Sequence, residues 1–78
     1  MKILLFGTGE YYQKYKKWFD KENIVALLDN DKDKQGNYID DIIVMSPNKI
    51  EDVEYDIVVI LSFFVKEMKE QLLSKGVR

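Results

Sequence analysis

Hydrophobic and polar positions along the chain predict four short strands, separated by helical or polar segments. Runs of strand length cover residues 2–6, 24–29, 42–44 and 56–61, and the first and last are apolar on both faces. Strands that are apolar on both faces are typical of the centre of a parallel sheet, where helices cover both sides. The pattern therefore predicts a buried parallel sheet.

The first helix is expected over residues 10–22. Its apolar side chains fall at i, i+1, i+4, i+7 and i+8, and lysines occupy the opposite face. Asn23 is a candidate for the left-handed residue that ends this helix. Residues 30–37 are too charged to be buried, so they predict a loop rich in turns.

Two further helices follow the later strands. Ser46 as N-cap and Pro47 in the first helical position predict a helix of barely two turns. Ser62 is expected to cap the last helix, and Gly76 to end it as the residue after the C-cap. The side chains expected to face inward from the last helix are Phe64, Val65, Met68, Leu72 and Leu73.

The order of these elements predicts an α/β fold. Right-handed crossovers would place the four parallel strands in the order 3-2-1-4, with helices on both faces, as a Rossmann-like three-layer module. A complete doubly wound sheet usually has five or six strands. We therefore expect residues 1–78 to form a single domain that is the truncated half of such a fold and a fragment of a larger protein.

A glycine turn directly after the first strand is the main candidate for binding chemistry. Gly7 and Gly9 flank Thr8, and Asp29 follows 22 residues after Gly7, at the end of the second strand. In dinucleotide-binding units such glycines allow a tight turn and a close approach of pyrophosphate, and the acid accepts from a ribose hydroxyl. The third glycine of that motif is Tyr12 here, a ring expected to displace the helix or to lie across the pocket.

Alternative interpretations of these residues stay open. The glycines could serve the backbone alone, and Asp29 could instead begin an Asx turn. Phe63 and Phe64, at the rim of the expected crevice, could stack on a base or a sugar, or simply pack in the core. The residues predicted to line a cofactor site are Gly7, Thr8, Gly9, Glu10, Asp29, Asn30, Ser62 and Phe63.

The composition excludes several classes of catalytic and metal chemistry. The 78 residues include no cysteine and no histidine, which excludes thiolate nucleophiles, imidazole acid–base catalysis and zinc clusters built on them. A formal net charge of −2 argues against nucleic acid as a partner. Acids at Asp29, Asp31 and Asp33 imitate a calcium loop, but Lys34 stands where such a loop needs glycine. We therefore expect no catalytic residue, no metal site and no membrane span, and a cytoplasmic location.

Several short strings resemble one group of proteins. The residues 5–11, LFGTGEY, are followed by LDND at 28–31, KQG at 34–36 and VMSP at 44–47. Together they resemble the small Rossmann-like N-terminal domain of bacterial sugar-modifying enzymes of the nucleotide-sugar acetyltransferase type. Similar modules are fused to glycosyltransferases and methyltransferases of surface-polysaccharide pathways. The resemblance implies a nucleotide or nucleotide-sugar site at Gly7, Thr8, Gly9 and Asp29.

Two hypotheses about function follow. The first is a non-catalytic module of a glycan-pathway transferase that binds a nucleotide-sugar or an NAD-type dinucleotide. The second is a structural or oligomerisation domain that keeps the shell of the fold without a ligand. In either case the apolar run at residues 57–61 would leave an open sheet edge. This predicts pairing with the rest of a parent protein or a homodimer, or else only marginal stability of the 78-residue chain.

Overall fold

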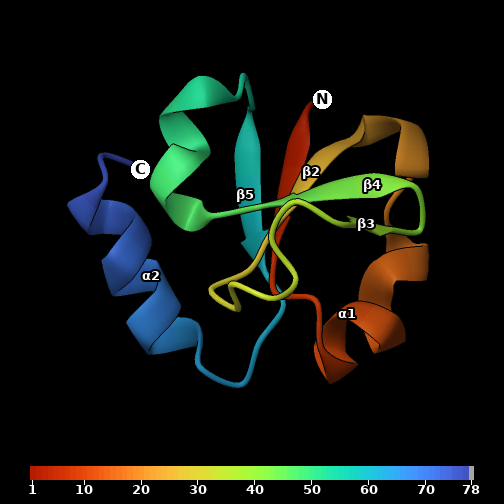
Figure 1. Ribbon diagram of the computed structural model, residues 1–78, viewed down its shortest axis with the longest axis horizontal. Coiled ribbons are helices and arrows are strands. Elements are labelled where there is room, and N and C mark those ends of the chain that lie inside the picture. Colours follow the sequence, from red (N-terminus) through yellow and green to blue (C-terminus); the bar gives the residue numbers. More distant parts are fainter. Residues whose placement is uncertain (78) are drawn as a thin grey trace.

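The computed structural model describes residues 1–77, which form one sheet with helical segments on both of its faces (Figure 1). The sheet has five strands in the order β3-β4-β2-β1-β5. The strands are β1 (Ile3–Phe6), β2 (Ile24–Leu28), β3 (Tyr38–Ile39), β4 (Ile42–Met45) and β5 (Ile57–Ile60). The helices are α1 (Glu10–Tyr15) and α2 (Val65–Ser74), and three 3₁₀ segments are η1 (Lys16–Trp18), η2 (Lys21–Asn23) and η3 (Pro47–Asp52).

The predicted fold class, a parallel four-stranded Rossmann-like sheet, is wrong. The sheet is mixed, because β3 pairs antiparallel with β4, and the chain forms a small α+β domain with little helix. The strand that the sequence did not predict, β3, is joined to β4 by a tight turn. In this turn Asp40 and Asp41 both have positive φ, 52° and 65°. Two such residues between strands are typical of a primed hairpin turn, which matches the twist of an antiparallel pair.

Side chains from the first helical region hold this hairpin turn. The Tyr12 hydroxyl donates to Asp40 Oδ2 at 2.7 Å, and Lys16 Nζ lies 3.0 Å from the same oxygen. Burial and the neighbouring Asp40 carboxylate raise the pKa of Tyr12 above its usual value. The hydrogen bonds from Tyr12 and Lys16 lower the pKa of Asp40. These contacts tie the turn between β3 and β4 to the first helical region.

The first helix is much shorter than its apolar pattern predicts. It ends at Tyr15 and continues as η1, Phe19 is extended, and Asn23 ends η2 without a left-handed backbone. A 13-residue helix would extend about 20 Å, whereas a strand of four residues spans about 13 Å. The segmented path keeps Tyr15 and Phe19 packed against this short sheet.

Of the three predicted ends of the later helices, two are confirmed and one is wrong. Ser46 caps η3 as predicted, because its side chain accepts from the backbone N–H of Asn48. Ser62 does not cap α2: its hydroxyl accepts from Phe64 N at 3.0 Å, one residue before the helix begins. Gly76 does end α2, with a φ of 86°. Hydrogen bonds from Gly76 N to Leu73 O and from Val77 N to Leu72 O complete a Schellman motif there.

Strand alternation divides the core between the two faces of the sheet. Leu4 and Phe6 of β1 belong to the cluster under α2 and η3, whereas Leu5 belongs to the cluster under α1. Figure 1 shows these helical segments on opposite sides of the strands. The sheet is thus covered on both sides even though the helices are short. Within residues 1–77, no helix has the length and apolar character needed to cross a membrane.

Candidate functional site

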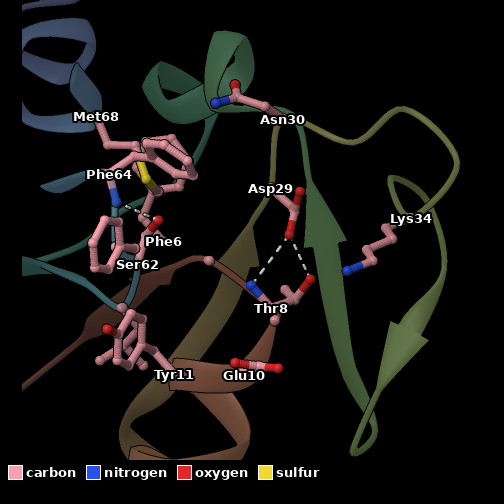
Figure 2. A pocket seen from close by; sticks show the side chains of 14 residues that line it. Phe6, Thr8, Glu10, Tyr11, Asp29, Asn30, Lys34, Ser62, Phe64 and Met68 are labelled. Atoms are coloured by element: carbon pink, nitrogen blue, oxygen red, sulfur yellow. Dashed lines mark hydrogen bonds between the residues drawn. The ribbon is translucent and has the colours of Figure 1, made fainter.

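A pocket of about 520 Å³ lies beyond the carboxyl ends of β1, β2 and β5 (Figure 2). Phe6 pairs with Leu28 on one side and with Ile60 on the other, so the three parallel strands end at the same level. The loops that leave these ends therefore meet above the sheet edge, where open parallel sheets commonly bind ligands. The pocket lining includes all eight residues predicted for the site: Gly7, Thr8, Gly9, Glu10, Asp29, Asn30, Ser62 and Phe63. Their role in binding stays a prediction.

The two glycines of the turn have different tasks. Gly7 has a φ of +117°, and a Cβ atom there would overlap the backbone carbonyl oxygen of Leu61. The Gly7 N–H also donates to the Leu28 carbonyl at 2.8 Å, which joins the turn to the end of β2. A Cβ at Gly9, by contrast, would meet no atom within 4 Å. Gly7 is thus required by packing, and Gly9 leaves open backbone at the pocket surface.

The Asp29 carboxylate links the glycine turn to the loop after β2. Its Oδ2 accepts from the backbone N–H of Thr8 at 3.1 Å and from the Thr8 hydroxyl at 2.5 Å (Figure 2). Its Oδ1 accepts from the Asp31 N–H at 2.8 Å, which confirms the predicted Asx turn. Because Thr8 is buried, these hydrogen bonds fix the floor of the pocket. A contact between Asp29 and a ribose hydroxyl stays a prediction.

The expectation that Tyr12 lies across the pocket is wrong. Its ring is only 1% exposed, and it packs between α1 and the sheet in the cluster with Leu5 and Leu27. Its neighbour Tyr11 lines the pocket instead. The chain therefore places a bulky residue in the third-glycine position by turning the ring away from the pocket and toward Asp40.

One wall of the pocket is aromatic and open to solvent. Phe63 is 80% exposed and Phe64 63% exposed, and their rings meet edge to face at 6.0 Å. The expectation that Phe64 faces the core is therefore wrong, as it is for Val65 and Leu73 of α2. Because α2 begins only at Val65, the turn held by Ser62 carries both phenylalanines out beside the pocket.

Other lining residues were not predicted. Lys34 comes from the loop between β2 and β3, and Met68 from the first turns of α2. Nothing in the local sequence separates Lys34 from the other charges of its loop, because its position depends on how the loop folds back. Asn30 and Gln71 join that loop to α2 by a reciprocal pair of amide hydrogen bonds of 3.1 and 2.9 Å. The lining residues that the sequence did not single out are Phe6, Tyr11, Lys34, Leu61 and Met68, whereas Phe64 is at the rim, which was one of its two expected places.

The pocket combines four titratable side chains with an aromatic wall. Its titratable side chains are Glu10, Tyr11, Asp29 and Lys34, of which Asp29 is already engaged with Thr8 and Asp31. Across residues 1–77, no group of three or more acidic side chains is arranged to hold a metal ion. The arrangement can hold a polar ligand between a glycine-lined floor and an aromatic wall.

No curated protein and no solved structure gives a match to the chain. The family model described as "C2185-like, N-terminal" matches residues 1–78, the full length of the sequence. The chain therefore belongs to the C2185-like N-terminal family.

Proposed function

We propose that this chain is a non-catalytic binding module whose pocket takes a nucleotide or a nucleotide-sugar. The observation that carries the proposal is the meeting of a glycine turn, a strand-ending acid and an exposed aromatic pair in one pocket of about 520 Å³. A volume of this size is ordinary for sites that hold a small organic ligand. We expect the module to act in the cytoplasm as part of a glycan-pathway transferase.

The polar end of the pocket suits the sugar and phosphate parts of such a ligand. The open space at Gly9 allows a ligand to approach the backbone closely. Asp29 keeps acceptor capacity beside Thr8, since each carboxylate oxygen can accept more than one hydrogen bond. A ribose hydroxyl at this acid is the contact expected of a strand-ending carboxylate in a nucleotide site.

The aromatic end suits the base. Phe63 presents most of its ring to the pocket and to solvent, and Phe64, Tyr11 and Met68 line the same space. Nucleotide bases stack on such rings with little dependence on sequence, because every base has a π face. A ring that is 80% exposed contributes little to the core. Contact with a stacked base would bury this apolar surface.

Substitution of Phe63 tests this proposal. Calorimetric titration with UDP-glucose, NAD and coenzyme A should detect binding of at least one of them to the wild-type chain. Phe63→Ala should weaken that binding about tenfold, because stacking on one aromatic ring contributes about 1–3 kcal/mol. Stability should change little, since the ring is largely exposed.

Trp18→Ala is the matched control, because Trp18 is 72% exposed and lies outside the pocket lining. It should leave the affinity unchanged. Flat titrations for all three ligands at millimolar concentration, with folded protein, would contradict the proposal. An equal loss in both variants would show that the aromatic wall is not the base contact.

A second observation favours the alternative, a domain that associates through its sheet edge. In residues 1–77, β5 has a strand neighbour only on one side, and an apolar groove of about 470 Å³ runs between it and α2. The N–H groups of Ile57 and Leu61 donate toward the β1 side, to the carbonyls of Lys2 and Phe6. The N–H groups of Val58 and Ile60 therefore face outward. A two-fold axis at Val59 would pair Val58 of one copy with Ile60 of another, a self-complementary contact.

Ile57→Lys tests this association. Ile57 is 42% exposed on the edge strand, and a lysine there opposes edge-to-edge pairing while leaving the core intact. If a second copy binds at β5, light scattering should show a dimer for the wild-type chain and a monomer for Ile57→Lys. Tyr38→Lys, on the opposite edge strand β3, should stay dimeric. A wild-type monomer at high concentration would remove this candidate.

A further inference from the structure

Lys34 is the one cationic side chain in a pocket that also carries two carboxylates, those of Glu10 and Asp29. Figure 2 shows its ammonium group directed back toward the side of the pocket that holds Thr8 and Asp29. Within residues 1–77, Lys34 Nζ takes part in no ion pair and no side-chain hydrogen bond, whereas Lys16 and Lys21 are paired with acids elsewhere. Its charge is therefore available to a ligand.

The loop that carries Lys34 is held in one conformation by its own hydrogen bonds. The N–H groups of Lys34 and Gln35 donate to the Asp31 carbonyl, and the Gln35 side chain donates to the Asp29 carbonyl at 2.8 Å. The Asn37 side chain donates to the Asp33 carbonyl at 2.8 Å, and Gly36 N donates to Val44 O at 2.8 Å. These contacts bind the loop to β2 and β4. Lys34 is partly buried, whereas its neighbours Lys32 and Asp33 are exposed.

We propose that Lys34 is the residue that recognises phosphate in this pocket and that it restricts the ligand to nucleoside diphosphate esters. This inference rests on the proposed function and names the ligand class within it. One ammonium group can neutralise part of a diphosphate diester, which carries two negative charges. A nucleoside triphosphate or a 2′-phosphorylated dinucleotide brings additional charge toward Glu10 and Asp29, and like charges at short range repel.

The arrangement of the pocket fits this assignment. Figure 2 shows Lys34 and Asp29 on one side of the pocket and Phe64 on the other. The Phe63 ring meets that of Phe64 edge to face, so a base and a phosphate would have separate places. A strand-ending acid on the ribose also disfavours a 2′-phosphate. A ligand without phosphate would leave the ammonium group of Lys34 without its partner, and would bind only through the aromatic wall and the acid.

Lys34→Gln, with Lys32→Gln as the matched control from the same loop, tests the inference by calorimetry. The probes are two pairs, uridine with UDP-glucose and adenosine with NAD, together with UTP and NADP. In the wild-type chain the diphosphate ester of the pair that binds should bind about tenfold more tightly than its nucleoside, as expected for one charge-assisted hydrogen bond. Lys34→Gln should remove this margin and leave the nucleoside affinity unchanged, whereas Lys32→Gln should keep it.

Three results would overturn the inference while leaving the proposed function in place. They are an equal affinity for nucleoside and diphosphate ester, an unchanged margin in Lys34→Gln, and a tighter binding of UTP or NADP than of the corresponding diphosphate ester. If neither pair nor coenzyme A binds the folded wild-type chain, the proposed function fails and this inference fails with it. Binding of coenzyme A alone, which carries an additional phosphate, would also overturn the inference and leave the proposed function in place. Circular dichroism of both variants confirms that they are folded, which the partial exposure of Lys34 predicts.

Discussion

Gly7→Ala is expected to destabilise the domain by about 3 kcal/mol, enough to unfold much of a chain this small. Two costs add at this position. The φ of +117° is one that residues with a Cβ rarely adopt, and the new methyl group would overlap the Leu61 carbonyl oxygen. That oxygen belongs to backbone at the end of β5, so it cannot move aside without disturbing the hydrogen bond from Leu61 N to Phe6 O.

Denaturant unfolding of the two glycine variants measures the effect. Gly9→Ala is the control, because φ at Gly9 is negative and a Cβ there meets open space. It should lower the free energy of unfolding by much less than Gly7→Ala does. Its methyl group would instead protrude at the pocket surface and weaken ligand binding. Equal stability of the two variants would contradict the described packing of the turn against Leu61.

Tyr12→Ala should cost about 3–5 kcal/mol, the range for truncating a large buried aromatic residue. The ring is 1% exposed and its hydroxyl holds Asp40 in the hairpin turn, so both the core and the β3–β4 pair lose support. Tyr12→Phe keeps the ring and removes only the hydrogen bond. It should cost about 1 kcal/mol, the usual net contribution of one such bond.

Thermal unfolding of both Tyr12 variants checks this order of effects, with Tyr11→Phe as a control on the pocket side of the same helix. Since Tyr12 lies outside the pocket, Tyr12→Phe should leave ligand affinity unchanged. A gain in affinity on truncating Tyr12 would revive the interpretation that its ring blocks the site. A Tyr12→Ala variant as stable as the wild type would contradict the burial of the ring.

The sequence pattern located the apolar strands and the glycine turn, because both depend on local features. Residues 3–6, 24–28, 42–45 and 57–60 are strands, near the ranges read from their apolar runs. Gly76 and Ser46 were read correctly for the same reason: each acts on backbone groups within a few residues. The eight lining residues that the sequence predicts follow from where the parallel strands end, so these too were accessible from the sequence.

The remaining features depend on contacts between distant segments. The fold class was wrong because Tyr38–Ile39 is too short to stand out as a strand, and two aspartates with positive φ conceal the hairpin turn. Such a turn is stable here because Tyr12 and Lys16 hold Asp40 from 28 and 24 residues away. The direction of the Tyr12 ring likewise depends on a distant segment, because its hydroxyl donates to Asp40.

The site differed from expectation for a related reason. Helical periodicity predicted that Phe64 faces inward, but the helix starts only after it, so the periodicity does not apply there. Lys34 reaches the pocket because Gln35 and Gly36 bind its loop to β2 and β4, which no spacing in the loop reveals.

Amide chemical shifts during a titration with UDP-glucose test the central claim most directly. If the pocket beyond β1, β2 and β5 is the binding site, the backbone amides that shift should cluster at its lining, above all at Thr8, Gly9, Asn30, Ser62 and Phe63. The amides of Val58 and Ile60, beside the second groove, should stay in place. Two results would contradict the claim that this pocket binds a nucleotide. One is shifts confined to that groove, and the other is no shift at all with either UDP-glucose or NAD up to millimolar concentration.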